Sequence, residues 1–248
     1  MKASPYQTPI GLSQHAFLVG VTGGGKSTRM LLQLSARLAI LKAVRATYSS
    51  YRIVLVDSKR VGFGKDDNLG HYADYAKRHG GIISRDYRAL PWNNATTHLF
   101  VYRPIRANVT PEHFSDFFAF MNGLSVRTAR GPVALPFLII IDELTDIAAD
   151  DRSRLTYMKP FTQLMTEGRD LMQTAWILTQ SPRFIFGDIR RNTTARFKFR
   201  LPDPEDADYV SKIMGYKPVR ERNPDPFGFW YQNDLLDSTT PPIYVSQT

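Results

Sequence analysis

Cysteine, long apolar runs and an apolar leader are all missing from this chain, and each absence excludes a class of protein. The 248 residues include no cysteine, so neither disulfides nor thiolate metal sites can form. No apolar run approaches the roughly 18–20 residues that a membrane-spanning helix needs. The first six residues, MKASPY, lack the apolar core of a secretory signal peptide. We therefore expect a cytoplasmic protein with no membrane segment.

Acidic residues are scarcer than basic ones. The chain has 23 Asp and Glu against 32 Lys and Arg, which gives a net charge of +9 and a pI of about 9.7. This excess favours a polyanionic partner such as nucleic acid, and composition alone leaves a merely basic surface as the alternative. Nothing resembling a linker divides the sequence. We expect one domain over residues 1–248, with residues 1–14 as a surface arm.

A glycine-rich loop is the most informative stretch of the chain. The apolar run HAFLV at 15–19 leads into GVTGGGKST at 20–28, and an amphipathic segment follows. The G-x-x-x-x-G-K-[ST] spacing of a Walker A loop is satisfied by Gly20, Gly25, Lys26 and Ser27. This arrangement predicts the strand, loop and helix of a nucleoside triphosphate site.

The residue types of the loop suit phosphate chemistry. Glycines let the backbone curl so that successive N–H groups bind phosphate oxygens, aided by the positive end of the following helix. Lys26 would reach the β- and γ-phosphates, and the Ser27 hydroxyl would hold Mg²⁺. The residues that we expect to bind ATP are Gly20, Thr22, Gly23, Gly24, Gly25, Lys26, Ser27 and Thr28.

Apolar runs alternate with helical patterns along the chain, which predicts an α/β fold with a mostly parallel sheet flanked by helices. A half-exposed strand is expected over 194–201 and a C-terminal β-hairpin over 227–245. The other expected strands cover 15–19, 51–56, 98–102, 137–141 and 174–178, and the expected helices cover 27–43, 68–79, 111–124, 152–172 and 204–214.

Two carboxylates follow the most apolar of these runs, in the manner of a Walker B pair. Asp142 can hold Mg²⁺, and Glu143 is placed to polarise the attacking water, although an acidic N-cap is the alternative for the pair. Gln180 ends the next expected strand. Because ligands bind at the carboxyl ends of parallel strands, its amide could sense the γ-phosphate or orient the water.

Six motifs come in the order seen in the FtsK/HerA group of DNA-translocating ATPases, which the chain resembles over about residues 12–245. The T-G-x-G-K-S signature of the group is matched, as is its T-Q-x-P after the sensor strand. The matching segments are GVTGGGKS at 20–27, VDSK at 56–59, IIDE at 140–143, EGR at 167–169, TQSP at 179–182 and NTTARF at 192–197.

The resemblance implies a RecA-like (ASCE) core that assembles into a ring of five or six subunits around double-stranded DNA. ATP would lie at each subunit interface, and an arginine from the neighbour would complete the site. By position Arg169 would be that arginine, with Arg196 as the second candidate; a cation near a helix C-terminus is the alternative for Arg169.

Compared with full-length members of the group, the sequence shows no long linker and no winged-helix sequence reader. It therefore looks more like a viral genome-packaging ATPase, for which a portal or capsid vertex is a candidate partner. A conjugative or host DNA-processing motor stays open, as does a phage-assembly ATPase that does not grip DNA. Candidate DNA-binding stretches are 60–96 and 183–191, with a solvated basic loop as the alternative for each. The basic residues of the first stretch and its border are Lys59, Arg60, Lys65, Lys77, Arg78, Arg85 and Arg88.

Overall fold

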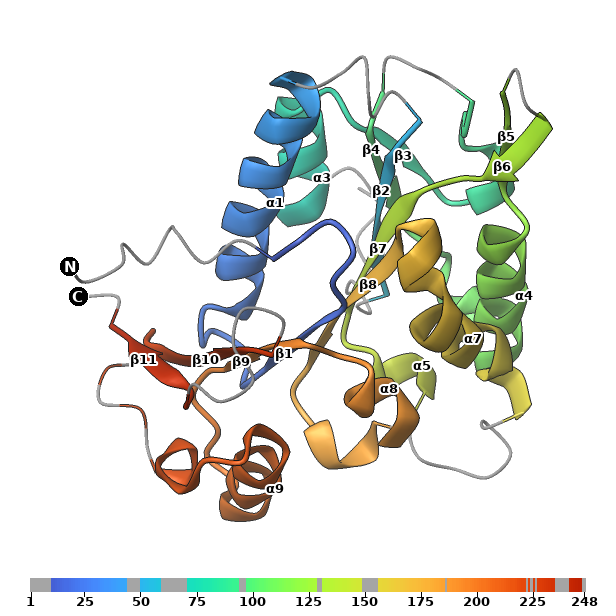
Figure 1. The fold of residues 1–248 in the computed structure, drawn as a ribbon. Helices are drawn as coiled ribbons and strands as arrows, with labels where there is room; N and C mark the ends of the chain where they lie inside the picture. Colours follow the sequence, from blue (N-terminus) through green and yellow to red (C-terminus); the bar gives the residue numbers. More distant parts are fainter. Residues whose placement is uncertain are drawn as a thin grey trace.

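A nine-stranded sheet forms the centre of the computed structural model. The model describes residues 10–43, 50–58, 71–93, 97–128, 131–148, 156–185, 187–221, 223, 225, 227–234 and 241–246. The strands run in the order β11-β10-β9-β1-β8-β7-β2-β4-β3 (Figure 1). They are β1 (Ala16–Val19), β2 (Arg52–Asp57), β3 (Ile82–Ser84), β4 (Leu99–Tyr102), β7 (Phe137–Asp142), β8 (Gln173–Thr179), β9 (Ala195–Lys198), β10 (Phe229–Asn233) and β11 (Ile243–Val245).

The sheet is parallel from β3 through to β9, and β10 and β11 add an antiparallel hairpin to its end. The predicted α/β class with a mostly parallel sheet and a C-terminal hairpin is therefore confirmed. Strand β1 pairs with β8 on one side and β9 on the other, so β8 separates β1 from β7. Because the strands are parallel, the carboxyl ends of β1, β7 and β8 meet at one edge of the sheet.

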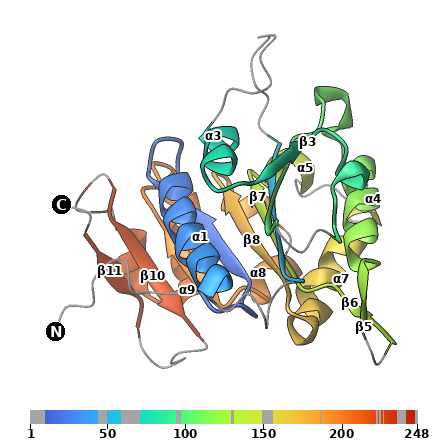
Figure 2. The ribbon, with the colours of Figure 1, turned by 90° about the horizontal axis from the view of Figure 1, so that it is seen from above.

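Helices cover both faces of the sheet, as Figures 1 and 2 show. One face packs against α1 (Lys26–Ala43) and α3 (His71–Arg78), and the other packs against the other helices of the described residues. The latter are α4 (Pro111–Asn122), α5 (Thr145–Ala148), α7 (Lys159–Glu167), α8 (Gly187–Arg191) and α9 (Pro204–Met214). Short 3-10 turns are η1 (Tyr87–Ala89), η2 (Arg106–Asn108), η3 (Gly168–Leu171), η4 (Pro182–Phe184) and η5 (Lys217–Arg220), and a separate hairpin joins β5 (Ser125–Thr128) to β6 (Gly131–Ala134).

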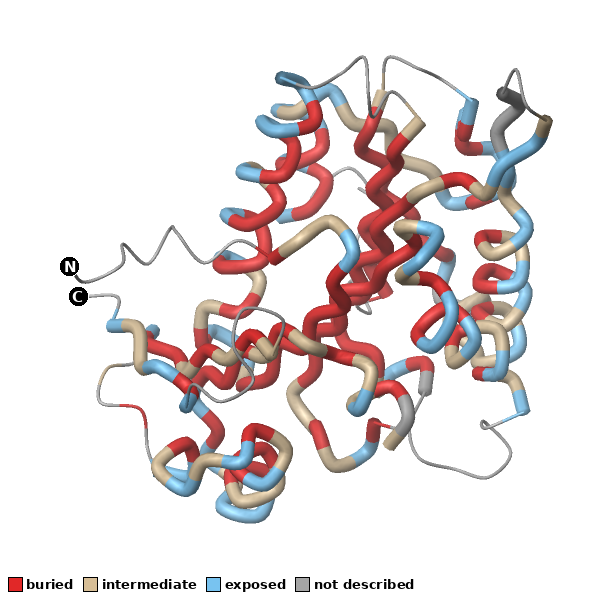
Figure 3. The backbone as a smooth tube through the Cα atoms, viewed as in Figure 1, coloured by how far each residue is buried: buried red, intermediate tan, exposed pale blue. Residues whose placement is uncertain are grey.

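The apolar strands are buried because both faces of the sheet are covered, and Figure 3 shows them as buried along their length. All six residues of β7 are buried. Successive side chains point to opposite faces. Accordingly, Leu138 and Ile140 pack on the α1 side and Ile139 and Ile141 on the α4 side. A single continuous apolar run therefore supplies both halves of the core.

The phenylalanine-rich segment after residue 110 is a core helix, as predicted. The Thr110 hydroxyl accepts a hydrogen bond from the His113 N–H at 3.3 Å, and Pro111 occupies the first turn, so both start signals operate. The side chains of Phe114, Phe117, Phe118 and Met121 are fully buried against the sheet and α7.

Two predicted elements differ from the structure, and two observed elements were not predicted. A strand, β9, is present within the predicted range 194–201, but it is buried rather than half-exposed: Lys198 is 1% exposed, and its amine donates to the Glu221 carbonyl and the Asn223 Oδ1. The predicted helix at 152–172 is represented in the described part by α7 and η3, and residues 149–155 lie outside the described residues. Strand β3 and the β5–β6 hairpin were not predicted.

The N-terminal segment was predicted as a surface arm up to residue 14. Residues 1–9 lie outside the described part, but 10–14 belong to the fold. Ile10 is buried in the core beside α1, and the Gln14 amide nitrogen donates to the Asn233 Oδ1 at 2.6 Å. Among the described helices, none is both long and apolar enough to cross a membrane.

Candidate nucleotide site

The glycine-rich loop joins β1 to α1 and is anchored to both neighbours of β1. The Gly20 N–H donates to the Thr179 carbonyl of β8 at 3.1 Å, and the Val21 N–H donates to the Arg200 carbonyl beyond β9 at 3.0 Å. Within the loop, the Gly24 N–H donates to the Val21 carbonyl at 3.1 Å. The base of the loop is therefore fixed by the sheet itself.

Three of the motif glycines are required by the geometry. Gly23 and Gly25 have φ angles of 75° and 91°, in the left-handed region that other residues rarely adopt. A Cβ atom on Gly20 would lie 2.6 Å from the Phe199 Cβ. Glycine is therefore required at these three positions by the backbone conformation of the loop and by its close contact with Phe199.

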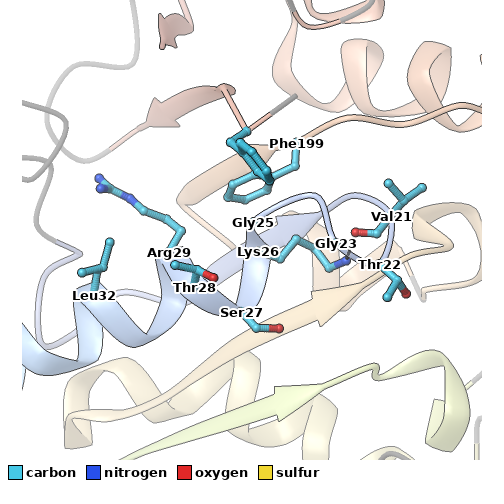
Figure 4. A pocket seen from close by; sticks show the side chains of 11 residues that line it. Val21, Thr22, Gly23, Gly25, Lys26, Ser27, Thr28, Arg29, Leu32 and Phe199 are labelled. Atoms are coloured by element: carbon cyan, nitrogen blue, oxygen red, sulfur yellow. Dashed lines mark hydrogen bonds between the residues drawn. The ribbon is translucent and has the colours of Figure 1, made fainter. Parts of the chain in front are cut away.

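Lys26 turns its side chain into the loop. Its ammonium donates to the carbonyl of Gly20 and, at 3.0 Å, to the carbonyl of Val21, and the residue is only 6% exposed. Lys26, Ser27 and Thr28 line a cavity of about 390 Å³ together with the loop (Figure 4). The positive charge is therefore concentrated where the loop amides would bind phosphate.

The cavity is also lined by apolar and aromatic side chains that the sequence analysis did not single out, Phe199, Phe227 and Leu32. Phe227 and Leu32 are 54% and 41% exposed, and the rings of Phe199 and Phe227 lie beside Gly25 of the loop. The Arg29 guanidinium lies 4.9 Å from the centroid of the Phe229 ring. Aromatic side chains beside a phosphate-binding loop suit a nucleotide with a flat base. No local motif marks these residues, because they come from three distant segments.

Asp142 ends β7 at the same edge of the sheet and is 1% exposed. The hydroxyl of Tyr72 on α3 donates to its Oδ2 atom at 2.5 Å. Burial and the nearby Asp142 charge raise the pKa of Tyr72, and a hydrogen bond from Ser27 acts in the opposite direction. Ser27 and Asp142 therefore approach the same hydroxyl, and a serine oxygen beside a carboxylate suits Mg²⁺. Tyr72 was missed because its role depends on contacts between distant parts of the chain.

Asp57 lies beside this centre in the VDSK motif. It ends β2 in register with Asp142, and the Nε atom of Arg103 lies 3.3 Å from its Oδ2 atom. Both side chains are buried, so Arg103 offsets the charge of Asp57 within the core. Lys59 of the same motif lies outside the described residues.

Glu143 leaves the strand with an unusual backbone. Its φ of 69° is left-handed, a conformation that costs about 1–3 kcal/mol in a non-glycine residue and is concentrated at functional sites. The carboxylate accepts hydrogen bonds from the Thr179 hydroxyl at 2.9 Å, from the Gln180 backbone N–H at 3.1 Å and from the Thr145 hydroxyl. It is thus held at the tip of β8.

Gln180 lies directly after β8, at the edge where the loop, Asp142 and Glu143 meet. Its backbone N–H, rather than its side-chain amide, makes the contact with Glu143. The role of the amide as a sensor therefore stays a prediction. The backbone contact could not be read from the residue type.

Arg169 lies at the opposite edge of the sheet. It is in η3, just before β8, and it neighbours His15, which precedes β1. Burial and the charge of Arg169 lower the pKa of His15 to about 4. The seven residues of β8 span roughly 20 Å between this edge and the loop. The structure therefore does not bring Arg169 to Lys26 of its own chain, and its predicted role across an interface stays a prediction.

Arg196, the second candidate, is engaged within the chain. Its side chain is 12% exposed on β9. The guanidinium donates to Asp234 Oδ2 at 2.6 Å and to Gln232 Oε1 at 3.1 Å. An arginine held in this way would have to break an ion pair before it could contact a neighbouring subunit.

The candidate DNA-binding stretches are only partly described. Residues 59–70 and 94–96 lie outside the described part, which leaves Lys77 and Arg78 at the end of α3 and Arg85 and Arg88 beyond it. In the second stretch, Arg183 forms ion pairs with three carboxylates near the start of α9, Asp203, Glu205 and Asp206. Its charge is therefore largely offset within the chain.

No family model and no curated protein matches the chain, but solved structures do. The genome-packaging NTPase B204 of Sulfolobus turreted icosahedral virus 2, in complex with AMPPCP, is 13% identical with a TM-score of 0.62, over 96% of this chain and 100% of that one. B204 of Sulfolobus turreted icosahedral virus, a DNA-packaging ATPase, is 13% identical with a TM-score of 0.64, over 95% and 98%. The pCW3 conjugation coupling protein TcpA with ATPγS is 17% identical with a TM-score of 0.54, over 94% and 59%. These neighbours are the kinds of ATPase that the sequence motifs resemble, and the expected P-loop ATPase fold is confirmed.

Proposed function

We propose that this protein is an ATP-driven translocase of double-stranded DNA that works as a ring, with viral genome packaging as its role. The observation that carries the proposal is the convergence of Lys26, Asp142 and Glu143 at one edge of the sheet. These are the parts that phosphoryl transfer to water requires: a cation for the phosphates, a metal-holding carboxylate and a base near the nucleophile.

Each group has a distinct task in hydrolysis. The loop amides and Lys26 bind the β- and γ-phosphates and offset their charge. Ser27 and Asp142 would hold Mg²⁺, which would supply positive charge to offset the phosphates. The Glu143 carboxylate accepts a hydrogen bond from the attacking water and orients the water towards the γ-phosphate. The hydroxyl of Thr179 and the N–H of Gln180 fix the carboxylate so that it approaches from the tip of β8.

The DNA part of the proposal rests on charge and on likeness of fold. A net charge of +9 supports a polyanionic partner, and B204, with the same fold, is a packaging ATPase. A motor that moves along any sequence must hold phosphates rather than bases, so binding should be independent of sequence and strongly salt-dependent. A ring of five or six subunits in the host cytoplasm, docked on a portal or capsid vertex, would use this grip to fill a capsid.

Conjugative DNA transfer is the second candidate, favoured by the likeness to the coupling protein TcpA. A phage-assembly ATPase that does not bind DNA is the third. The first two share one biochemical property that the third lacks, namely stimulation of ATP hydrolysis by duplex DNA.

The test is an ATPase assay with and without long duplex DNA, over a series of salt concentrations. We expect several-fold stimulation by duplexes of unrelated sequence, which falls steeply as salt rises. The Lys26→Ala variant is the control for contaminating ATPases. Hydrolysis that duplex DNA leaves unchanged would overturn the translocase proposal and favour the assembly ATPase.

A further inference from the structure

The hydroxyl of Tyr72 is the contact between the metal-holding carboxylate and α3. It donates to the Asp142 Oδ2 atom at 2.5 Å, and the side chain of Ser27 approaches the same hydroxyl. Tyr72 is 4% exposed and Asp142 is 1% exposed. Helix α3 thus places the Tyr72 hydroxyl next to both Ser27 of the loop and Asp142 of β7.

A short hydrogen bond to an ionised carboxylate is stronger than one between neutral groups. The terminal torsion of an aspartate is broad, so a free carboxylate at a strand end samples a wide range of orientations. A buried donor on one oxygen removes that freedom and sets the plane of the carboxylate. For an ion such as Mg²⁺, which demands near-ideal octahedral geometry, this orientation decides affinity.

The tyrosine is itself held rigidly. Its ring packs in the core cluster between α1 and the sheet, and Tyr75, one turn further along α3, shares a hydrogen bond of 2.8 Å with Ser35 of α1. Because α1 also carries Ser27 at its start, the two expected metal ligands and Tyr72 belong to one packed unit. The orientation of Asp142 is therefore set by how α3 docks on α1.

We propose that Tyr72 is a positioning residue for Mg²⁺: its hydroxyl orients Asp142 and couples that carboxylate to Ser27. This rests on the proposed ATPase function. Groups that orient metal ligands from outside the coordination sphere typically change metal affinity by about 10–100-fold when removed. Tyr72 does not touch the reacting phosphate in this account, and its effect acts through Asp142.

The experiment compares Tyr72→Phe with Tyr75→Phe, which removes the same hydroxyl from the same buried helix face but contacts Ser35 instead of Asp142. A fluorescent, non-hydrolysable ATP analogue is bound to each protein, first in EDTA and then over a Mg²⁺ titration. We expect Tyr72→Phe to need about 10–100-fold more Mg²⁺ for the metal-dependent gain in affinity. Affinity in EDTA should match the wild type, because the loop and Lys26 are intact, and Tyr75→Phe should match it in both measurements.

A double-mutant cycle with Asp142→Asn isolates the pair. If Tyr72 acts through Asp142, adding Tyr72→Phe to Asp142→Asn should change the Mg²⁺ midpoint no further.

An unchanged or lowered midpoint in Tyr72→Phe would overturn the inference, as would an equal loss of affinity in EDTA, which would place the effect on the loop instead. A wild-type protein whose analogue binding ignores Mg²⁺ would overturn the proposed ATPase function together with it.

Discussion

At the scale of single residues, one backbone angle at Glu143 decides where its carboxylate lies. A continuing β-strand would send Asp142 and Glu143 to opposite faces. The left-handed φ at Glu143 instead turns its carboxylate to the tip of β8, beside the end of the strand that holds Asp142. Both carboxylates thus face the same edge of the sheet.

Replacement of Glu143 by Gln should therefore separate binding from hydrolysis. The amide oxygen can still accept hydrogen bonds from Thr179 and Gln180, so the variant should fold and bind ATP. Its hydrolysis should fall by about 10²–10⁴-fold, because a neutral amide cannot act as a base. Lys26→Ala should instead weaken nucleotide binding itself. Steady-state ATPase and analogue-binding assays measure the two effects, and near-normal hydrolysis by Glu143→Gln would contradict its assignment.

Lys198 gives a pH-dependent contribution to stability. Burial lowers its pKa to about 8 from the ordinary 10.5, while its amine donates to the Glu221 carbonyl at 2.9 Å and the Asn223 Oδ1 at 2.7 Å. Below pH 8 the amine is charged in the folded and the unfolded state, so the penalty of burying the charge is fully present. Between pH 8 and 10.5 the unfolded state binds more protons, and the free energy of unfolding therefore rises with pH.

The expected size of this effect is about 2 kcal/mol between pH 7 and pH 9.5. Urea denaturation of the wild type and of Lys198→Met at both pH values isolates it, because other titrating groups are common to the two proteins. The difference in unfolding free energy should move in favour of the wild type at pH 9.5. A difference that does not change with pH would show that Lys198 titrates normally.

At the scale of elements, the turn between α7 and β8 depends on one glycine. A Cβ atom on Gly168 would lie 2.5 Å from the carbonyl oxygen of Gln173, a backbone atom that cannot move without shifting β8. Gly123 is a matched position after α4: its φ is also helical, and a Cβ atom there would lie no closer than 3.5 Å to any neighbouring atom.

Gly168→Ala should lower the free energy of unfolding by about 1–3 kcal/mol, the typical cost of overpacking. Gly123→Ala should be close to neutral or slightly stabilising, because it restricts only the unfolded chain. Urea denaturation of the two variants measures the contrast. Equal stability of both would mean that the η3 turn can relax away from β8.

Elements with a strong local pattern could be predicted from the sequence, and elements whose burial depends on distant neighbours could not. Strands β2, β7 and β8 each contain a continuous apolar run (IVLV, FLIII and AWIL), and α9 carries its cap at Asp203 and Gly215 at its end. Strand β9 looks half-exposed because Arg196 and Lys198 alternate with apolar residues, and its burial depends on β10, which pairs with it, and on Glu221 and Asn223, which contact Lys198. Strand β3 has three residues, too few for a pattern.

The same distinction between local patterns and distant contacts applies to the candidate site. Its loop and its Asp142–Glu143 pair were predictable, because chemistry fixes their residue types and spacing. Tyr72 and the aromatic residues that line the cavity were not predictable, because their contacts form only when the fold brings separate segments of the chain together.

At the scale of the whole molecule, the sheet has two chemically different edges. The carboxyl edge holds the loop, Asp142 and Glu143, and the amino edge holds His15 and Arg169. In a ring with one subunit's amino edge against the next subunit's carboxyl edge, Arg169 could complete a neighbour's site.

This geometry predicts rescue between two inactive variants. Arg169→Ala should fold and bind ATP and DNA but hydrolyse poorly, and Lys26→Ala lacks a working loop but keeps the arginine. Mixed in the presence of duplex DNA, part of the ATPase activity should return, because some interfaces pair an intact loop with an intact arginine. Gel filtration must show that mixed rings form. Activity no greater than the sum of the separate variants would contradict the assignment and leave Arg196 as the remaining candidate.

The position of β1 has a consequence for the order of events on the ribosome. Ala16 pairs with Trp176 on one side and with Ala195 on the other, so β1 is made well before both of its partner strands. At roughly 5–20 residues per second, that wait lasts on the order of 10–40 s. During this time β1 has no neighbouring strand to pair with, and the loop that follows it has no sheet to anchor it. ATP therefore cannot bind and stabilise the chain early in folding. The nascent chain is therefore exposed to aggregation until β8 and β9 have been made, and chaperones that bind unpaired strands are most useful in that interval.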